Sequence, residues 1–148
     1  MDAMDSKTAQ QVWKRVAAPH NPGLSPGDLH RLIQSAAETG ALYRSLAAAL
    51  GGKQKDGALV LVSGQQDTVC ALRGMGLMCF GREIAVKAPN VPRQNVRQIL
   101  ECCYQNAKEA LTEYTARTIL PEFGPVFRLL ASREEENCLR ILTLWGQL

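Results

Sequence analysis

Apolar residues recur at alternating steps of four and three residues in three segments of the chain. This spacing is typical of a helix that buries one face. Ser25, Pro26 and Asp28 predict the start of the first such helix, with Ser25 as the N-cap and the Asp28 carboxylate near the positive helix end. Gly51 and Gly52 predict its end. Its buried seam consists of Leu29, Ile33, Ala36, Gly40, Tyr43, Ala47 and Leu50.

Two later segments have the same spacing and predict two more helices. One spans about residues 93–119 and ends before Pro121, and the other follows the sequence around Phe127. The expected seam of the former is Val96, Leu100, Cys103, Ala107, Ala110 and Tyr114. The expected seam of the latter is Phe127, Ala131, Glu134, Cys138, Leu142 and Trp145.

The segment 59–80 has a weaker pattern. Its first residues could begin a strand, and Gly64, Gly74 and Gly76 each cost about 1 kcal/mol relative to Ala inside a helix. Its length nevertheless favours a helix, after a turn at residues 53–57. Residues 81–93, which include Pro89 and Pro92, predict an extended connection long enough to run the length of a bundle.

Together these elements predict an all-α fold, a ferritin-like four-helix bundle over residues 25–148. Two antiparallel helical hairpins joined by one long crossover define that topology. Residues 1–24 are expected to form an arm that packs on the domain through Val12, Trp13 and Val16. Pro19 and Pro22 exclude a continuous helix there.

Composition supports this fold and narrows the function. Of 148 residues, 46% are hydrophobic but only 5% are aromatic, which suits closely packed helices better than a β-sandwich. The net charge of +3 is scattered along the chain, so we expect no nucleic-acid partner. No apolar stretch approaches the roughly 20 residues that span a bilayer, so we expect no membrane partner.

The polar N-terminus and the odd number of cysteines indicate a cytoplasmic protein with reduced thiols. The first residues lack the apolar core of a signal peptide. The chain has five cysteines, and we expect them to be free thiols. Free cysteines commonly pack as small apolar residues of the core.

Two motifs occur twice in the same order. The pattern Ala36-x-Glu38-x4-Tyr43 recurs as Ala107-x-Glu109-x4-Tyr114, an offset of 71 residues (114 − 43). The pattern Asp67-x-x-Cys70 recurs as Glu135-x-x-Cys138, an offset of 68 (138 − 70). The repeat indicates one helical hairpin used twice.

These motifs resemble the rubrerythrin branch of the ferritin-like superfamily, particularly its small members without a rubredoxin tail. The resemblance is strongest in residues 103–114, 121–127 and 133–138. The resemblance covers about residues 10–148. It implies a non-haem di-iron oxidoreductase, often a peroxide reductase. The iron ligands would be a Glu two turns before each helix tyrosine and a Glu-x-x-His in each hairpin.

The ligand residues that this resemblance implies are mostly replaced. Ala36 and Ala107 stand where the terminal Glu ligands would be, and Cys70 and Cys138 stand in place of the imidazoles. Asp67 and Glu135 keep a carboxylate at the bridging positions, and Tyr43 and Tyr114 keep the neighbouring tyrosines. The two histidines, His20 and His30, lie outside any ligand spacing.

We therefore favour a bundle that has lost di-iron chemistry and serves a structural, binding or interaction role without a cofactor. One alternative is a mononuclear zinc site built from Asp67, Cys70, Glu135 and Cys138, since two thiolates and two carboxylates suit tetrahedral Zn²⁺. Another is a divergent oxidoreductase or a thiol-based peroxide reductase. The resemblance also implies a homodimer formed through helix faces, and the protein partner, if another exists, is not identified by the sequence.

Overall fold

The computed structural model describes residues 23–148, and in this range the chain is all-helical, with four helices and no strand. The helices are α2 (Pro26–Ala49), α3 (Gly52–Phe80), α4 (Val96–Ala116) and α5 (Gly124–Gly146). The four expected helices are therefore confirmed, including the one with the weakest pattern. The expected arm lies outside the described residues except for Gly23 and Leu24, and Leu24 is buried.

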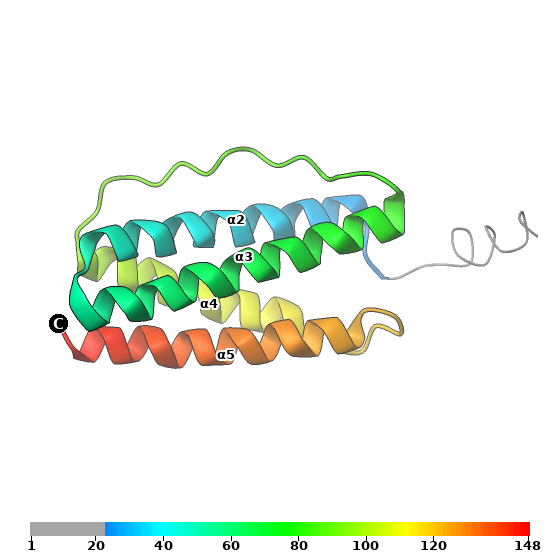
Figure 1. The fold of residues 1–148 in the computed structure, drawn as a ribbon. Helices are drawn as coiled ribbons and strands as arrows, with labels where there is room; N and C mark the ends of the chain where they lie inside the picture. The colour runs from blue at the N-terminus through cyan, green and yellow to red at the C-terminus, as the bar shows by residue number, and fades with distance from the viewer. Residues whose placement is uncertain (1–22) are drawn as a thin grey trace, which may run out of the picture.

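The helices form a four-helix bundle of two antiparallel pairs (Figure 1). α2 packs against α3 and α4, and α5 packs against α4 and α3. Residues 81–95 form an extended connection that returns along the length of the bundle from the end of α3 to the start of α4 (Figure 1). This connection makes α4 parallel to α3 and antiparallel to α2, so that Arg31 near the start of α2 lies beside Glu113 near the end of α4, and it confirms the predicted long connection.

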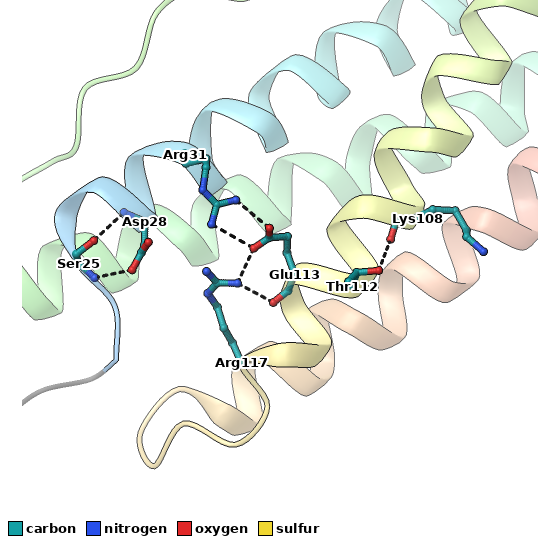
Figure 2. A network of polar contacts seen from close by, with 7 residues as sticks. All are labelled: Ser25, Asp28, Arg31, Lys108, Thr112, Glu113 and Arg117. Atoms are coloured by element: carbon teal, nitrogen blue, oxygen red, sulfur yellow. Dashed lines mark hydrogen bonds and ion pairs between the residues drawn. The ribbon is translucent and has the colours of Figure 1, made fainter.

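The start of α2 is the one that the sequence predicts. The Ser25 hydroxyl accepts a hydrogen bond from the Asp28 backbone N–H at 3.0 Å, and the Asp28 carboxylate accepts one from the Ser25 N–H at 3.1 Å (Figure 2). The hydrogen bond from the Ser25 backbone N–H is the main cause that lowers the pKa of Asp28. Asn95 and Gln98 form an equivalent capping box, which starts α4 at Val96 rather than near residue 93.

The predicted turn at residues 53–57 is wrong, because these residues form the first turns of α3. Gly52 takes a left-handed φ of 57°, and Gly51 is extended. Two glycines thus reverse the chain within two residues. Lys53, Gln54 and Lys55 are good helix formers, so the helix begins as soon as the reversal is complete.

One predicted seam also needs correction at its end. Leu142 and Trp145 are exposed, whereas Ile141 and Leu144 are buried. A straight helix has 3.6 residues per turn, so a strict seven-residue repeat drifts off the buried face after a few turns.

None of the helices in the described range is long and apolar enough to cross a membrane.

Candidate functional site

Five buried polar side chains separate two apolar clusters of the core. One cluster contains Tyr43, Leu61 and Ile141, and the other contains Leu72 and Phe127. On α2, α3 and α5 the polar residues fall between the last residue of one cluster and the first residue of the other. We call them the polar layer: Thr39, Gln65, Thr68, Glu134 and Asn137.

The polar layer contains an internal repeat. Gln65 and Thr68 are three residues apart on α3, and Glu134 and Asn137 are three apart on α5. Both pairs are related by the same offset of 69 residues (134 − 65 and 137 − 68). Residues with this spacing project from one helix face, so each helix presents two polar side chains to the core.

The predicted site residues of α3 and α5 do not form this layer. Asp67, Cys70 and Glu135 are exposed, and Cys138 alone of the four is buried. Each residue turns the helix by about 100°, so an alignment displaced by one or two positions points a side chain away from the core. Within residues 23–148 no three His, Cys, Asp or Glu side chains come together as a metal-ligand set. The predicted zinc ligands are therefore not assembled.

The other predicted positions do lie in the core. Ala36 and Ala107 are buried, as are Tyr43 and Tyr114. Burial, followed by the charge of Glu134, raises the pKa of both tyrosines. The tyrosines therefore stay neutral and lie close enough to Glu134 to sense its charge.

Hydrogen bonds of the polar layer join three pairs of helices. Gln65 Nε2 donates to the Ala36 carbonyl at 2.9 Å, which links α3 to α2. Arg133 Nη1 donates to Thr68 Oγ1 at 3.3 Å, which links α5 to α3. Asn106 Nδ2 donates to Thr39 Oγ1 at 3.2 Å, which links α4 to α2. The middle of the bundle is thus held together by amide, hydroxyl and guanidinium groups.

Three buried polar atoms in or beside the layer have no hydrogen-bond partner among the described residues. They are Tyr43 Oη, Gln65 Oε1 and Glu134 Oε1. An unpaired buried polar group costs about 1–3 kcal/mol. Buried atoms of this kind usually contact ordered water or a ligand, so the layer has unused hydrogen-bonding capacity.

Glu134 is the one buried carboxyl group in the described range. Burial raises its pKa to about 7, although the hydrogen bond from Asn137 and the charge of Arg133 act in the opposite direction. Asn137 Nδ2 donates to Glu134 Oε2 at 3.4 Å. Glu134 therefore exchanges a proton near neutral pH.

The polar layer does not fit the di-metal centre that the predicted fold family implies. Such a centre takes four carboxylates and two imidazoles from the four helices. The layer offers one carboxylate, two carboxamides and two hydroxyls. One negative charge cannot balance two divalent ions, and carboxamides and hydroxyls are weak replacements for imidazole.

A cleft of about 390 Å³ opens between α2 and α4 beside the layer. Ala36, Thr39 and Gln65 contribute to it, and so does Tyr114. The remaining lining residues are Arg31, Leu32, Ser35, Glu38, Asn106, Glu109, Ala110, Thr112 and Glu113. Most of the lining residues are polar, and the cleft includes Ala36, at which the sequence resemblance implies a replaced ligand.

An ion-pair network includes two residues of the cleft lining, Arg31 and Glu113 (Figure 2). Arg31 on α2 lies 3.0 Å from the Glu113 carboxylate on α4, and Arg117 lies 2.6 Å from it. The hydrogen bond from Arg31 is the main cause that lowers the pKa of Glu113. Glu113 is thus ionised and fully engaged.

The buried thiols are poorly suited to nucleophilic chemistry. Burial raises the pKa of Cys103 to about 12 and also raises the pKa of Cys138. A reactive thiol requires a lowered pKa and access to solvent. The exposed Cys70 has access, but Cys138 is buried, so they do not form an accessible pair.

Sequence reasoning missed Gln65, Thr68 and Asn137 but placed Glu134 in a seam. The sequence did contain a signal for the inner face of the last helix, because the predicted apolar seam included Glu134 and Cys138 and excluded Glu135.

Comparison of the chain with protein-family models, with curated proteins and with solved structures finds no match.

Proposed function

We propose that this chain is a ferritin-like protein, related to rubrerythrins, that no longer carries di-iron oxidoreductase chemistry and has a binding or structural role. The observation that carries the proposal is the pair Gln65-x-x-Thr68 and Glu134-x-x-Asn137. These pairs lie on the contacting helices α3 and α5, with the three-residue spacing of the Glu-x-x-His pairs that bind metal in such bundles.

Three replacements support the loss of metal chemistry. If the pairs of the polar layer, rather than Asp67-x-x-Cys70 and Glu135-x-x-Cys138, correspond to the Glu-x-x-His pairs, Thr68 and Asn137 replace the imidazoles and Gln65 replaces one carboxylate. Each of these three side chains can form hydrogen bonds but carries no charge. Ala36 and Ala107 further remove the two carboxylates expected from α2 and α4.

The retained polar groups supply a structural role instead. A metal centre ties four helices together through its ligands. Here the hydrogen bonds from Gln65, Arg133 and Asn106 connect the same helices without an ion. A network of this kind specifies how helices align, because each buried polar group must find its partner.

Elemental analysis by mass spectrometry tests the proposal on protein purified without chelator or affinity metal. We expect no stoichiometric metal. Iron near two atoms per chain would overturn the proposal, since that is the content of an intact di-iron site. About one zinc per chain would instead favour the alternative of a mononuclear zinc site.

A peroxide-consumption assay on the same preparation addresses the enzymatic alternative. We expect the protein to consume peroxide no faster than a control sample that was unfolded and whose cysteines were then all alkylated. Turnover that is abolished by replacing Cys70 and Cys138 with Ala would indicate a thiol peroxidase and contradict the proposal. The expected homodimer and the cytoplasmic location stay predictions.

A further inference from the structure

A second recess is formed by α2, α3 and the extended connection that follows α3. Its volume of about 360 Å³ falls within the range of about 300–1,000 Å³ that is typical of ligand pockets. Its described lining residues are Ala37, Gly40 and Arg44 from α2, Gln65, Gln66, Val69 and Cys70 from α3, and Pro89 from the connection. Three separate elements therefore wall the recess.

The surface of this recess is mainly apolar. Ala37 and Gly40 lie three residues apart on α2, and neither has a side chain larger than a methyl group, so this side of α2 leaves the recess open. Val69 adds an aliphatic side chain from α3, and Pro89 adds its ring from the connection. The described part of the lining contains no aromatic ring, so the recess suits an aliphatic group better than a stacked ring.

The wall that the connection supplies is held in place by contacts with both helices. Gln34 Nε2 on α2 donates to the Lys87 carbonyl at 3.1 Å, and the Lys87 N–H donates back to Gln34 Oε1 at 2.9 Å. Ile84 packs closely on Gly76 of α3, where a Cβ would lie only 3.2 Å from Ile84 Cδ1. Pro89 follows two residues after Lys87 and has a fixed φ. A wall that is ordered before a ligand arrives lowers the entropic cost of binding.

Arg44 is the one charged side chain among the described lining residues. It folds back along α2, and its Nη1 lies 3.6 Å from the position that a Cβ on Gly40 would take. It forms no hydrogen bond or ion pair with any residue from 23 to 148. The guanidinium therefore keeps its donors for a ligand, and no carboxylate of the described lining competes for them.

We propose that this recess binds a small monocarboxylate with an aliphatic chain. The carboxylate pairs with Arg44, because the planar guanidinium matches its two oxygens. The chain lies against Ala37, Val69 and Pro89 and removes their apolar surface from water. A cation finds no opposite charge in the described lining, and a dianion finds only one.

This inference names the ligand class for the binding role proposed above and rests on that role, but it does not use metal content. A metal-free protein that binds no alkanoate would overturn this inference alone. A di-iron protein that binds an alkanoate would overturn the proposed function alone.

Isothermal titration calorimetry with butanoate, pentanoate and hexanoate tests the inference on the full chain. We expect saturable binding at one site per chain, with an affinity that rises about fourfold for each added methylene, as for burial of that group. Hexan-1-ol is the neutral control and hexylammonium is the cationic control. We expect the alcohol to bind more weakly than hexanoate and the ammonium not to bind. Absence of alkanoate binding, an affinity that is independent of chain length, or equal binding of hexylammonium would overturn the inference.

Two matched variants separate a site from general charge attraction. Arg44→Gln removes the cation of the recess, and Arg73→Gln removes an exposed cation of α3 that is not part of the lining. We expect Arg44→Gln to weaken hexanoate binding about two- to fivefold, as for loss of an exposed ion pair, and Arg73→Gln to leave it unchanged. Equal weakening in both variants would overturn the site.

Cys70 gives a second readout that needs no variant, because its exposed thiol belongs to the lining. We expect saturating hexanoate to slow the alkylation of Cys70 by iodoacetamide. The half-buried Cys79 is not part of the lining, so its alkylation should keep its rate. Peptide mapping by mass spectrometry measures both rates. An unchanged rate at Cys70, or equal slowing at both cysteines, would contradict the inference.

Discussion

The side-chain amide of Gln65 on α3 donates a 2.9 Å hydrogen bond to the backbone carbonyl of Ala36 on α2. Ala36 is the position at which the sequence resemblance implies a lost carboxylate ligand, and Gln65 is the member of the polar layer that reaches it. The two positions now contact each other directly. This bond connects α2 and α3 in the middle of the bundle through protein groups alone.

Gln65→Ala is expected to destabilise the protein by about 2–4 kcal/mol, because it removes this bond and leaves a cavity in the core. Gln66→Ala, at the exposed neighbouring position, is expected to change stability by less than about 0.5 kcal/mol. Urea denaturation followed by circular dichroism measures both. Equal effects of the two substitutions would show that Gln65 is not a core contact.

Glu134 is expected to make the protein less stable as the pH rises from 5 to 8. Its pKa is raised from 4.5 to about 7 in the folded state, so the folded chain holds a proton that the unfolded chain has released. The contribution of Glu134 to the free energy of unfolding is fully present below its unfolded pKa. It is lost as the pH rises from there through the folded pKa, and the total loss approaches about 3 kcal/mol. Glu134 is the group to which this dependence is assigned, since Tyr43 and Tyr114 titrate well above this range.

Glu134→Gln tests this assignment. The neutral amide removes the cost of burying a charge, so we expect the variant to be more stable than the parent at pH 8 and to lack the decline between pH 5 and 8. The exposed Glu135→Gln is the matched control and is expected to keep the decline. Thermal unfolding across this pH range distinguishes them, and a decline retained in Glu134→Gln would assign the titration to another group.

Glu113→Ala is expected to weaken the link between α2 and α4. Arg31 and Arg117 both contact this carboxylate, but Arg31 and Glu113 are 51% and 36% exposed, so solvent screens the pair (Figure 2). We expect a loss of at most about 1 kcal/mol at low salt and a smaller loss at 1 M NaCl. Glu109→Ala, which removes an unpaired carboxylate of the same helix, is the control for charge alone. A loss that does not depend on salt would contradict an electrostatic origin.

The five cysteines are expected to differ widely in their rate of alkylation. Cys70 is exposed, whereas Cys103 is fully buried with its pKa raised to about 12. Since the thiolate is the nucleophile, iodoacetamide should modify Cys70 first and Cys103 only after unfolding. Peptide mapping by mass spectrometry measures the order. Early modification of Cys103 would require an opening of the core that the packing of the four helices does not provide.

Local chemistry in the sequence determined the helices and most of their seams. Ser25 with Asp28 and the glycine pair at 51 and 52 specify helix ends through groups next to them in the chain, whereas α4 ends at Ala116, before the end near residue 119 that Pro121 predicts. The seams of α2 and α4 were also readable, because apolar residues there lie mainly on one side. Sequence therefore placed Ala36, Tyr43, Ala107 and Tyr114 correctly in the core.

Only the tertiary structure decided which polar residues of α3 face the core. On α3, Leu59 and Val60 are exposed beside the buried Leu61, so hydrophobicity alone does not define its inner face. The rotation of such a helix is decided by its neighbours: α2 accepts Gln65 at Ala36, and α5 supplies Arg133 to Thr68. These partners lie 29 and 65 residues away in the chain, so a pattern read along one helix could not select between Asp67-x-x-Cys70 and Gln65-x-x-Thr68.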